Sequence, residues 1–334
     1  MSANNSSSNG DDVPVYLPPK LVQFWLMLIF NNPSIICSFF LIFQIMINRQ
    51  RRYALQNHTI LFILLFGLPI QLFEINFYLV FYHYGIVLPS QPITCLIWWF
   101  ADIGFYNGGL MLRCWLAIER HILIFHDGRV SNRRGRFLFH YLPLILIVAY
   151  ILIFYITVLF FLPCKNTYDY TTELCGSPCY QSYDILVYIE VIVHGCVPTI
   201  LEAIVTLVLI FRVRWQKQRL HQSTKWRTNR RMLIQLFLVS GISIALNFPF
   251  TILEIFYLSG LSLEYQDEIY LCLWFLLYFV IFLFPFVSLP QYRDLWKKTR
   301  VRIFAAERRQ TNRAITVTYM KNKTLTPIVN INMM

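Results

Sequence analysis

Ionisable side chains stand inside the long apolar runs of this 334-residue sequence, where each needs a partner or a function. Glu119, Arg120 and His121 are consecutive near the end of one such run. An acid beside an arginine can form an ion pair that opens and closes, so these three residues could act as a switch. The alternative is a pair of charges that only anchors the run at a membrane surface.

A second arginine, Arg113, lies two helical turns deeper in the same run than Arg120. Its guanidinium cannot easily reach water at that depth and therefore needs a buried partner. We expect an ion pair with Glu202, which lies one turn after Pro198 in a later apolar run. Hydrogen bonds to Asn247 or to helix carbonyl groups would serve the same purpose.

Four further acids occur in separate apolar runs: Glu74, Asp102, Glu190 and Glu254. Several carboxylates that face one cavity without a basic partner attract a cation. We therefore expect these four residues to bind a ligand, such as a cationic amine or a basic peptide. The competing interpretation is that they are hydrogen-bonded structural groups or are protonated by burial. His194, near Glu190, is expected to be an interior residue rather than a ligand contact.

No spacing typical of a catalytic or metal site occurs in the sequence. The seven His form no pattern such as H-E-x-x-H, and neither a G-x-S-x-G turn nor a phosphate-binding loop is present. We therefore expect no catalytic residue, no metal, no cofactor and no enzymatic activity.

Four of the eight cysteines lie outside the apolar runs or at their edge: Cys95, Cys164, Cys175 and Cys179. Disulfides persist in an oxidising compartment, and the charge distribution described below assigns these residues to the outside. We expect the pairs Cys95–Cys179 and Cys164–Cys175, although spacing alone leaves all three connectivities open. The other four cysteines are expected to be small buried residues: Cys37, Cys114, Cys196 and Cys272.

The composition is that of a membrane protein, because 57% of the residues are hydrophobic and 14% are charged, against about 25% charged in soluble domains. The net charge of +12 does not indicate nucleic-acid binding, since the Lys and Arg cluster between apolar runs. A membrane-spanning helix needs about 20 apolar residues. Seven runs qualify, at residues 21–47, 58–84, 92–124, 138–162, 184–211, 230–258 and 268–290. The expected fold is an all-α integral membrane protein, a bundle of seven transmembrane helices over residues 21–290.

The positive charges predict an orientation in the lipid bilayer. If the loops alternate between two sides, 26 of the 29 Lys and Arg lie on one side, in residues 49–52, 120–136, 212–231 and 293–323. The positive-inside rule then predicts an extracellular N-terminus, a cytoplasmic C-terminus and a plasma-membrane location. Prolines within the runs are expected to kink the helices rather than to end them.

The two ends of the chain are polar. Residues 1–20 have no apolar core of a cleavable signal peptide and are expected to be an extracellular tail. Asn4 and Asn5 in this tail stand in N-x-S triplets and are glycosylation candidates, although such triplets also occur by chance. Residues 291–304 could form a short amphipathic helix on the inner leaflet or an ordinary basic segment. Residues 305–334 are expected to be a disordered cytoplasmic tail.

The third run combines Cys95 near one end with Glu119, Arg120 and His121 at the other. The 25 residue steps from Cys95 to Arg120 make about 37 Å of helix, enough to cross a bilayer. This combination resembles the third helix of rhodopsin-like (class A) G-protein-coupled receptors, whose motif is Asp/Glu-Arg-Tyr. The resemblance extends over residues 21–304 and is strongest to divergent, chemoreceptor-like members from invertebrates.

The resemblance implies that an extracellular small-molecule or peptide ligand opens a cytoplasmic cleft for a heterotrimeric G protein. Asp102 matches the position at which amine receptors of this family hold an ammonium group. Glu119 and Arg120 would pair at rest and separate on activation. A membrane transporter or channel is the alternative function, which the odd number of helices and the lack of a repeat disfavour.

The sequence also departs from the family pattern. Gly67 stands where the family has a sodium-binding Asp, and Phe284 replaces the Asn of the Asn-Pro-x-x-Tyr motif. Because that Asp and that Asn share one polar cluster, an allosteric sodium site is not expected.

Overall fold

The computed structural model describes residues 18–126, 128, 130, 132–219, 224–261 and 266–289. The chain divides into two compact units, Met1–Val287 and Ser288–Met334, and the architecture below is that of the first. Several expected features lie outside the described residues: glycosylation at Asn4 and Asn5, the amphipathic helix 291–304 and the tail 305–334.

Every regular element of the described residues is a helix. Six helices are long and apolar enough to cross a membrane: Lys20–Ile47, Gln56–Tyr84, Arg133–Phe161, Asp184–Trp215, Ile234–Leu258 and Glu268–Ser288. Their outer faces carry large apolar side chains that are more than half exposed, among them Ile36, Phe43 and Phe161. An apolar outer face is typical of helices surrounded by lipid. Six of the seven expected runs are thereby confirmed, and the architecture is that of an all-helical, multi-pass membrane protein.

The third expected run forms one continuous helix over residues 92–125. It consists of α5 (Pro92–Trp99), the wide turn η2 (Phe100–Phe105) and α6 (Tyr106–Phe125). It is long enough to cross a bilayer but is not among the six apolar helices. The reason is a set of polar side chains that it buries inside the protein: Asp102, Arg113, Glu119 and Arg120.

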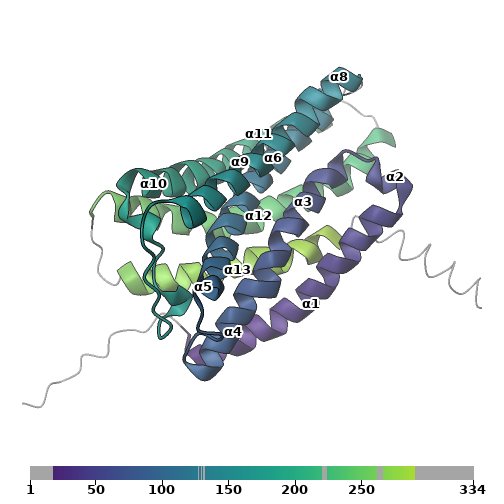
Figure 1. The fold of residues 1–334 in the computed structure, drawn as a ribbon. Helices are drawn as coiled ribbons and strands as arrows, with labels where there is room; N and C mark the ends of the chain where they lie inside the picture. The colour runs from purple at the N-terminus through teal and green to yellow at the C-terminus, as the bar shows by residue number, and fades with distance from the viewer. Residues whose placement is uncertain are drawn as a thin grey trace, which may run out of the picture. The chain divides into compact units, whose positions relative to one another are not determined.

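Helix α6 is the central element of the bundle (Figure 1). It packs against α3 (Gln56–Pro69), α9 (Leu142–Ile156), α11 (Val197–Arg219) and α12 (Thr224–Leu258). Gly108 allows α6 to approach α3 closely, because a Cβ atom at this position would lie 2.3 Å from the Phe66 ring. Small residues at such contacts are typical of helices that pack in membranes.

Wide, π-helical turns interrupt the long helices at several points: η1 (Ile70–Glu74), η2, η3 (Phe137–Tyr141), η4 (Thr157–Phe161) and η7 (Ile189–Cys196). Three of them adjoin Pro69, Pro143 and Pro198. Proline lacks an N–H group and disturbs the preceding turn, so Pro143 and Pro198 favour the widening at η3 and η7, whereas η1 follows Pro69. The turns re-aim polar side chains that reappear below: Glu74, Asp102, His140, Glu190 and His194.

Gln71 in η1 connects three helices in the middle of the bundle. Its Nε2 donates a hydrogen bond to Ser34 Oγ (2.8 Å) on α1 (Lys20–Ile47). Ser34 Oγ in turn donates to the carbonyl oxygen of Phe282 (3.0 Å) on α13 (Gln266–Ser288). These buried hydrogen bonds fix α1 against its neighbours, since each unmade bond in this apolar setting would be costly.

Two disulfides fasten the segment between η4 and α10 (Asp184–Tyr188). They join Cys95 to Cys175 and Cys164 to Cys179, with Cα–Cα distances of 5.8 and 6.0 Å. The four expected cysteines do form disulfides, but the expected pairing Cys95–Cys179 and Cys164–Cys175 is wrong. Of the other cysteines, Cys37, Cys114 and Cys196 are buried and Cys272 is partly buried, all as free thiols.

A tight turn at residues 173–176 explains the observed pairing. Trp99 Nε1 on α5 donates hydrogen bonds to the carbonyl oxygens of Leu174 (2.6 Å) and Gly176 (3.1 Å). These bonds hold Cys175, which takes a φ of 55°, directly over the start of α5. No spacing rule could have predicted a contact that depends on this indole.

Candidate functional site

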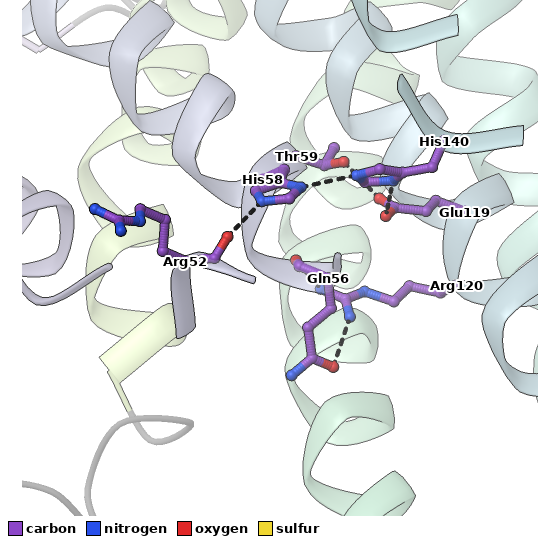
Figure 2. Close-up of polar contacts among 7 residues, drawn as sticks. All are labelled: Arg52, Gln56, His58, Thr59, Glu119, Arg120 and His140. Atoms are coloured by element: carbon purple, nitrogen blue, oxygen red, sulfur yellow. Dashed lines mark hydrogen bonds and ion pairs between the residues drawn. The ribbon is translucent and has the colours of Figure 1, made fainter. Parts of the chain in front are cut away.

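Polar groups from four elements meet around the second half of α6, all of them side chains except the backbone carbonyl of Arg52 (Figure 2). They are Glu119 and Arg120 of α6, Gln56, His58 and Thr59 of α3, His140 of η3, and Arg52 of α2 (Arg49–Arg52). The side chains of Glu119 and His140 are each 1% exposed. Burial of this degree makes every satisfied contact strong and every missing contact costly.

Glu119 is the centre of this inner network. Thr59 Oγ1 donates a short hydrogen bond to its Oε2, and His140 Nδ1 lies 2.8 Å from its Oε1. The contact with His140 is close, although the ring N–H direction is poorly aligned with the oxygen. On the other side of the ring, His140 Nε2 lies 2.9 Å from His58 Nδ1. His58 Nε2 lies 2.7 Å from the carbonyl oxygen of Arg52.

Arg120 is bound by a different partner. Its guanidinium donates hydrogen bonds to Gln56, one to the side-chain Oε1 (3.3 Å) and one to the backbone oxygen (3.0 Å). Glu119 is held by Thr59 and His140, so the expected pair of Glu119 with Arg120 is wrong. The physical reason is that consecutive residues of a helix project about 100° apart and face different neighbours.

His121 points to yet another neighbour. Its Nε2 lies 3.2 Å from Arg212 Nη1 on α11, and the Arg212 guanidinium also lies over the Phe125 ring at 5.2 Å. Of the three consecutive residues that we expected to act together, Glu119 and Arg120 both contact α3, whereas His121 contacts α11. Only Glu119 and Arg120 take part in the inner network.

Arg113 and Glu202 are buried, with 4% and 1% of their surfaces exposed, but no direct ion pair joins them. Glu202 Oε2 accepts a hydrogen bond from Ser243 Oγ at 2.9 Å, and its Oε1 has no partner. The Nε and Nη2 atoms of Arg113 have no hydrogen-bond partner, and its guanidinium lies 5.9 Å from the Tyr106 ring. The expected contact is therefore absent, because Glu202 turns toward α12, and the two charges interact only at longer range.

A cavity lies between η2, α6, η7, α12 and α13, with an empty volume of about 470 Å³ that includes the part open to solvent. Asp102, Glu190 and Glu254, three of the four expected ligand-binding acids, line it. The aromatic residues Phe250 and Trp274 also line it, and the described lining contains neither Lys nor Arg. Carboxylates next to aromatic faces form a site for a cation.

The fourth acid, Glu74, lies behind Asp102 rather than in the cavity wall. Asp102 Oδ1 accepts a hydrogen bond from Tyr278 Oη at 3.2 Å, and Tyr278 Oη accepts one from Trp274 Nε1 at 3.2 Å. Glu74 is fully buried close to Asp102 and Tyr278, but its oxygens have no well-aligned hydrogen bond. Glu74 is therefore a buried neighbour of Asp102 and not part of the described cavity lining.

The disulfide-bonded segment contributes to the cavity through Tyr180, which donates a hydrogen bond to Glu190 Oε2. Tyr180 follows Cys179 directly, so the Cys164–Cys179 disulfide helps to position its hydroxyl. Glu254 lies close to Gly195 of η7, where an added Cβ would stand 3.5 Å from its Oε2. The missing side chain at Gly195 leaves room for this carboxylate.

His194 is a satisfied interior residue, as expected. Its two ring nitrogens contact the hydroxyls of Tyr150 (2.9 Å) and Tyr155 (3.0 Å). Tyr155 also accepts a hydrogen bond from Asn107 Nδ2 (2.7 Å), and Asn107 lines the cavity. His194 therefore supports the cavity wall and does not line it.

Sequence reasoning missed several residues of both sites: Gln56, His58, Thr59 and His140 at the inner network, and Tyr180, Trp274 and Tyr278 at the cavity. His58 and His140 carried a signal, because each is a histidine at the edge of an apolar run. Their contact joins residues 82 positions apart and could not be predicted from spacing.

Comparison with models of protein families finds no family that matches this chain, and comparison with curated proteins finds no similar protein. The functional assignment therefore depends on the fold and on the chemistry of the two sites.

Proposed function

We propose that this chain is a receptor with seven transmembrane helices that binds an extracellular cation and activates a heterotrimeric G protein. In this proposal residues 92–125 form the seventh span, the N-terminus is extracellular and the C-terminus is cytoplasmic. The cluster of basic residues between apolar helices supports this orientation. The burial of Asp102, Arg113, Glu119 and Arg120 supports the additional span, because its polar groups face protein rather than lipid.

One observation carries the proposal: a single helix connects the two sites. Asp102 lines the cavity, and Glu119 and Arg120 belong to the inner network on the same helix. The 17 residue steps from 102 to 119 correspond to about 26 Å. A ligand that shifts this helix at the cavity would also strain the contacts of Glu119 and Arg120. Such coupling through a rigid element is a common basis of signalling across membranes.

The cavity favours a small cationic amine. Three acids line it together with aromatic residues, and its described lining contains neither Lys nor Arg. An ammonium group could contact Asp102, Glu190 or Glu254 while its apolar part packs on Phe250 and Trp274.

The test is a G-protein activation assay of cells that express the full chain, with a panel of amines applied from outside. We expect activation by at least one amine, and Asp102→Asn should reduce its potency by about 10–100-fold. This range follows from the roughly 1.5–3 kcal/mol of a hydrogen bond to a charged group. Asp169→Asn is the matched control, because Asp169 is an exposed acid of the outer segment whose carboxylate accepts hydrogen bonds from Thr171 and does not line the described cavity.

Arg120→Ala separates binding from signalling. It should abolish G-protein activation while amine binding to the membranes is retained, because Arg120 lies far from the cavity lining. Equal potency of the wild type and Asp102→Asn would contradict the ligand site. Amine-dependent current or uptake without G-protein activation would instead identify a channel or transporter.

A further inference from the structure

A second cavity lies beside Arg113, between α1, α3, η1, α6 and α13. It has about 20 Å³ of space for a water-sized group, against the roughly 10–15 Å³ that one water molecule needs. Tyr106 belongs to the wall of this cavity and to that of the cavity lined by Asp102, so it separates the two. Arg113 itself is buried and lies on α6 between Asp102 and Arg120. The second cavity is therefore a small space in the middle of the bundle.

The guanidinium of Arg113 lies at this cavity. A helical side chain leans toward the turn before its own residue, and Gly109 stands in that turn. A Cβ atom at Gly109 would lie 3.2 Å from Arg113 Nη1, so the missing side chain leaves room for the guanidinium. Gly109, Tyr106 and Arg113 all form part of the cavity wall. The guanidinium thus extends along α6 beside the cavity.

The protein does not use the donors of this guanidinium. Its Nε and Nη2 atoms have no hydrogen-bond partner, and no carboxylate of the described residues forms an ion pair with Arg113. Glu202 acts on this charge only at longer range, because its carboxylate accepts a hydrogen bond from Ser243 and does not line the cavity. The Tyr106 ring lies 5.9 Å away, and the Tyr106 hydroxyl donates to Asn247. An arginine keeps its charge in proteins, and a buried charge without a direct counter-charge is costly.

The rest of the cavity wall offers a donor but no negative charge, since the described lining contains neither Asp nor Glu. Gln71 supplies the amide of this wall, and its Oε1 already accepts a hydrogen bond from Ser38 Oγ (3.3 Å). Its Nε2 donates one hydrogen to Ser34 Oγ (2.8 Å), and an amide group has two. Most of the remaining wall is apolar, as at Ile63 and Phe284. A cation would find no counter-charge here, whereas an anion would meet a guanidinium and an amide N–H.

We propose that this cavity binds one small monovalent anion of the size of chloride, with the Arg113 guanidinium as its principal ligand. The anion neutralises the buried charge and accepts hydrogen bonds from donors that the protein leaves unused. A water-sized space with a largely apolar wall favours a single halide ion over phosphate or sulfate, which are larger and carry more charge. The wall comes from α1, α3, η1, α6 and α13, so the bound ion stabilises their packing. The proposal goes beyond the receptor function and does not depend on it.

The test is the thermal unfolding midpoint, Tm, of the full chain in neutral detergent, in sodium chloride and in sodium gluconate of equal concentration. Gluconate is an organic anion that is larger than this cavity, so it reproduces the ionic strength without filling the site. A ligand that binds only the folded chain raises its stability by mass action. A tenfold excess of chloride over its dissociation constant should therefore raise the Tm of the wild type by roughly 3–5 °C.

Arg113→Gln removes the charge from the cavity wall, so its Tm should be the same in the two salts. Arg133→Gln is the matched control, because Arg133 is an exposed arginine outside the cavity wall. It should retain the chloride-dependent rise of the wild type. Loss of the rise in Arg133→Gln would show that chloride acts at surface arginines and would overturn the proposal.

Gly67→Asp decides the question if Arg113→Gln does not fold. Gly67 belongs to the cavity wall, and an added Cβ would lie 3.6 Å from Ile281 Cγ2, an ordinary contact distance. The new carboxylate places a permanent negative charge in the cavity and takes the place of the anion. Chloride should then no longer raise the Tm.

Three further results would contradict the anion site. They are a wild type with the same Tm in chloride and in gluconate, an Arg113→Gln variant that keeps the chloride-dependent rise, and a Gly67→Asp variant that keeps this rise or does not fold. The readout is stability, so it remains informative whether or not the chain activates a G protein.

Discussion

The Tyr278 hydroxyl connects α13 to Asp102, one of the three acids that line the cavity. It donates a hydrogen bond to Asp102 and accepts one from Trp274. Tyr278→Phe keeps the ring but removes both hydrogen bonds. We expect the free energy of unfolding to fall by roughly 1–3 kcal/mol, because the buried acceptor Asp102 and the partly buried donor Trp274 lose their partner.

The measurement for Tyr278→Phe is thermal unfolding of the purified chain at a fixed pH. Tyr270→Phe is the control, since the Tyr270 ring packs against Phe250 and Trp274 but its hydroxyl bonds to no described residue. Equal stability of Tyr278→Phe and the wild type would show that the hydroxyl does not hold Asp102.

At the residue scale, sequence reasoning found the charged positions but not their partners. Buried acids and arginines in apolar runs are conspicuous, so Glu119, Arg120 and Asp102 could be identified from residue type alone. The partner of a buried group depends on the direction of its side chain and on residues far away in the sequence. The Glu119–Arg120 and Arg113–Glu202 pairs failed for this reason, since both were argued from position along one helix or from depth.

At the scale of helices, the contact between α6 and α3 depends on Gly108. A methyl group there would stand 2.3 Å from one ring carbon of Phe66 and 2.6 Å from another. We expect Gly108→Ala to destabilise the fold by roughly 1–3 kcal/mol, as overpacking of a close contact does. The second substitution Phe66→Leu should recover part of this loss, because it removes the ring that the methyl group meets.

Gly241→Ala on α12 is the control for Gly108→Ala. A Cβ atom at Gly241 would meet nothing within 4 Å, so the change should be neutral or should stabilise the helix by up to about 1 kcal/mol. The measurement is thermal unfolding of the wild type and of these three variants. Similar Tm values for the two alanine variants would mean that α6 and α3 are not packed as closely as described.

The disulfide pairing is a second property of the elements rather than of single residues. In Cys95→Ser the partner of Cys95 becomes a free thiol, and the structure identifies that partner as Cys175. Alkylation of the unreduced variant followed by fragment mass spectrometry should therefore find the label on Cys175. A label on Cys179 would show that Cys95 pairs with Cys179, as expected from the sequence. The turn at 173–176 would then not be linked to α5 by a disulfide.

Helix positions were predictable because lipid requires long apolar segments, but the wide turns within them were not. A π-helical turn adds one residue without any change in hydrophobicity, so the 3.6-residue pattern does not reveal it. These turns carry Asp102, His140 and Glu190 into the sites. The prolines next to three of them were the available signal, and we interpreted them only as kinks.

For the whole molecule, the number of membrane crossings is the decisive quantity. Six helices are apolar enough to cross, and residues 92–125 form the additional helix that connects the cavity with the inner network. An even number of crossings places both termini on the same side of the membrane, whereas seven crossings place them on opposite sides. The receptor function requires the second arrangement.

The most direct test is antibody labelling of the full chain with one epitope tag at each terminus, in intact and in permeabilised cells. Seven crossings predict that the N-terminal tag is labelled on intact cells and that the C-terminal tag is labelled only after permeabilisation. Labelling of both tags under the same condition would show that residues 92–125 do not cross the membrane, and would contradict the receptor proposed here.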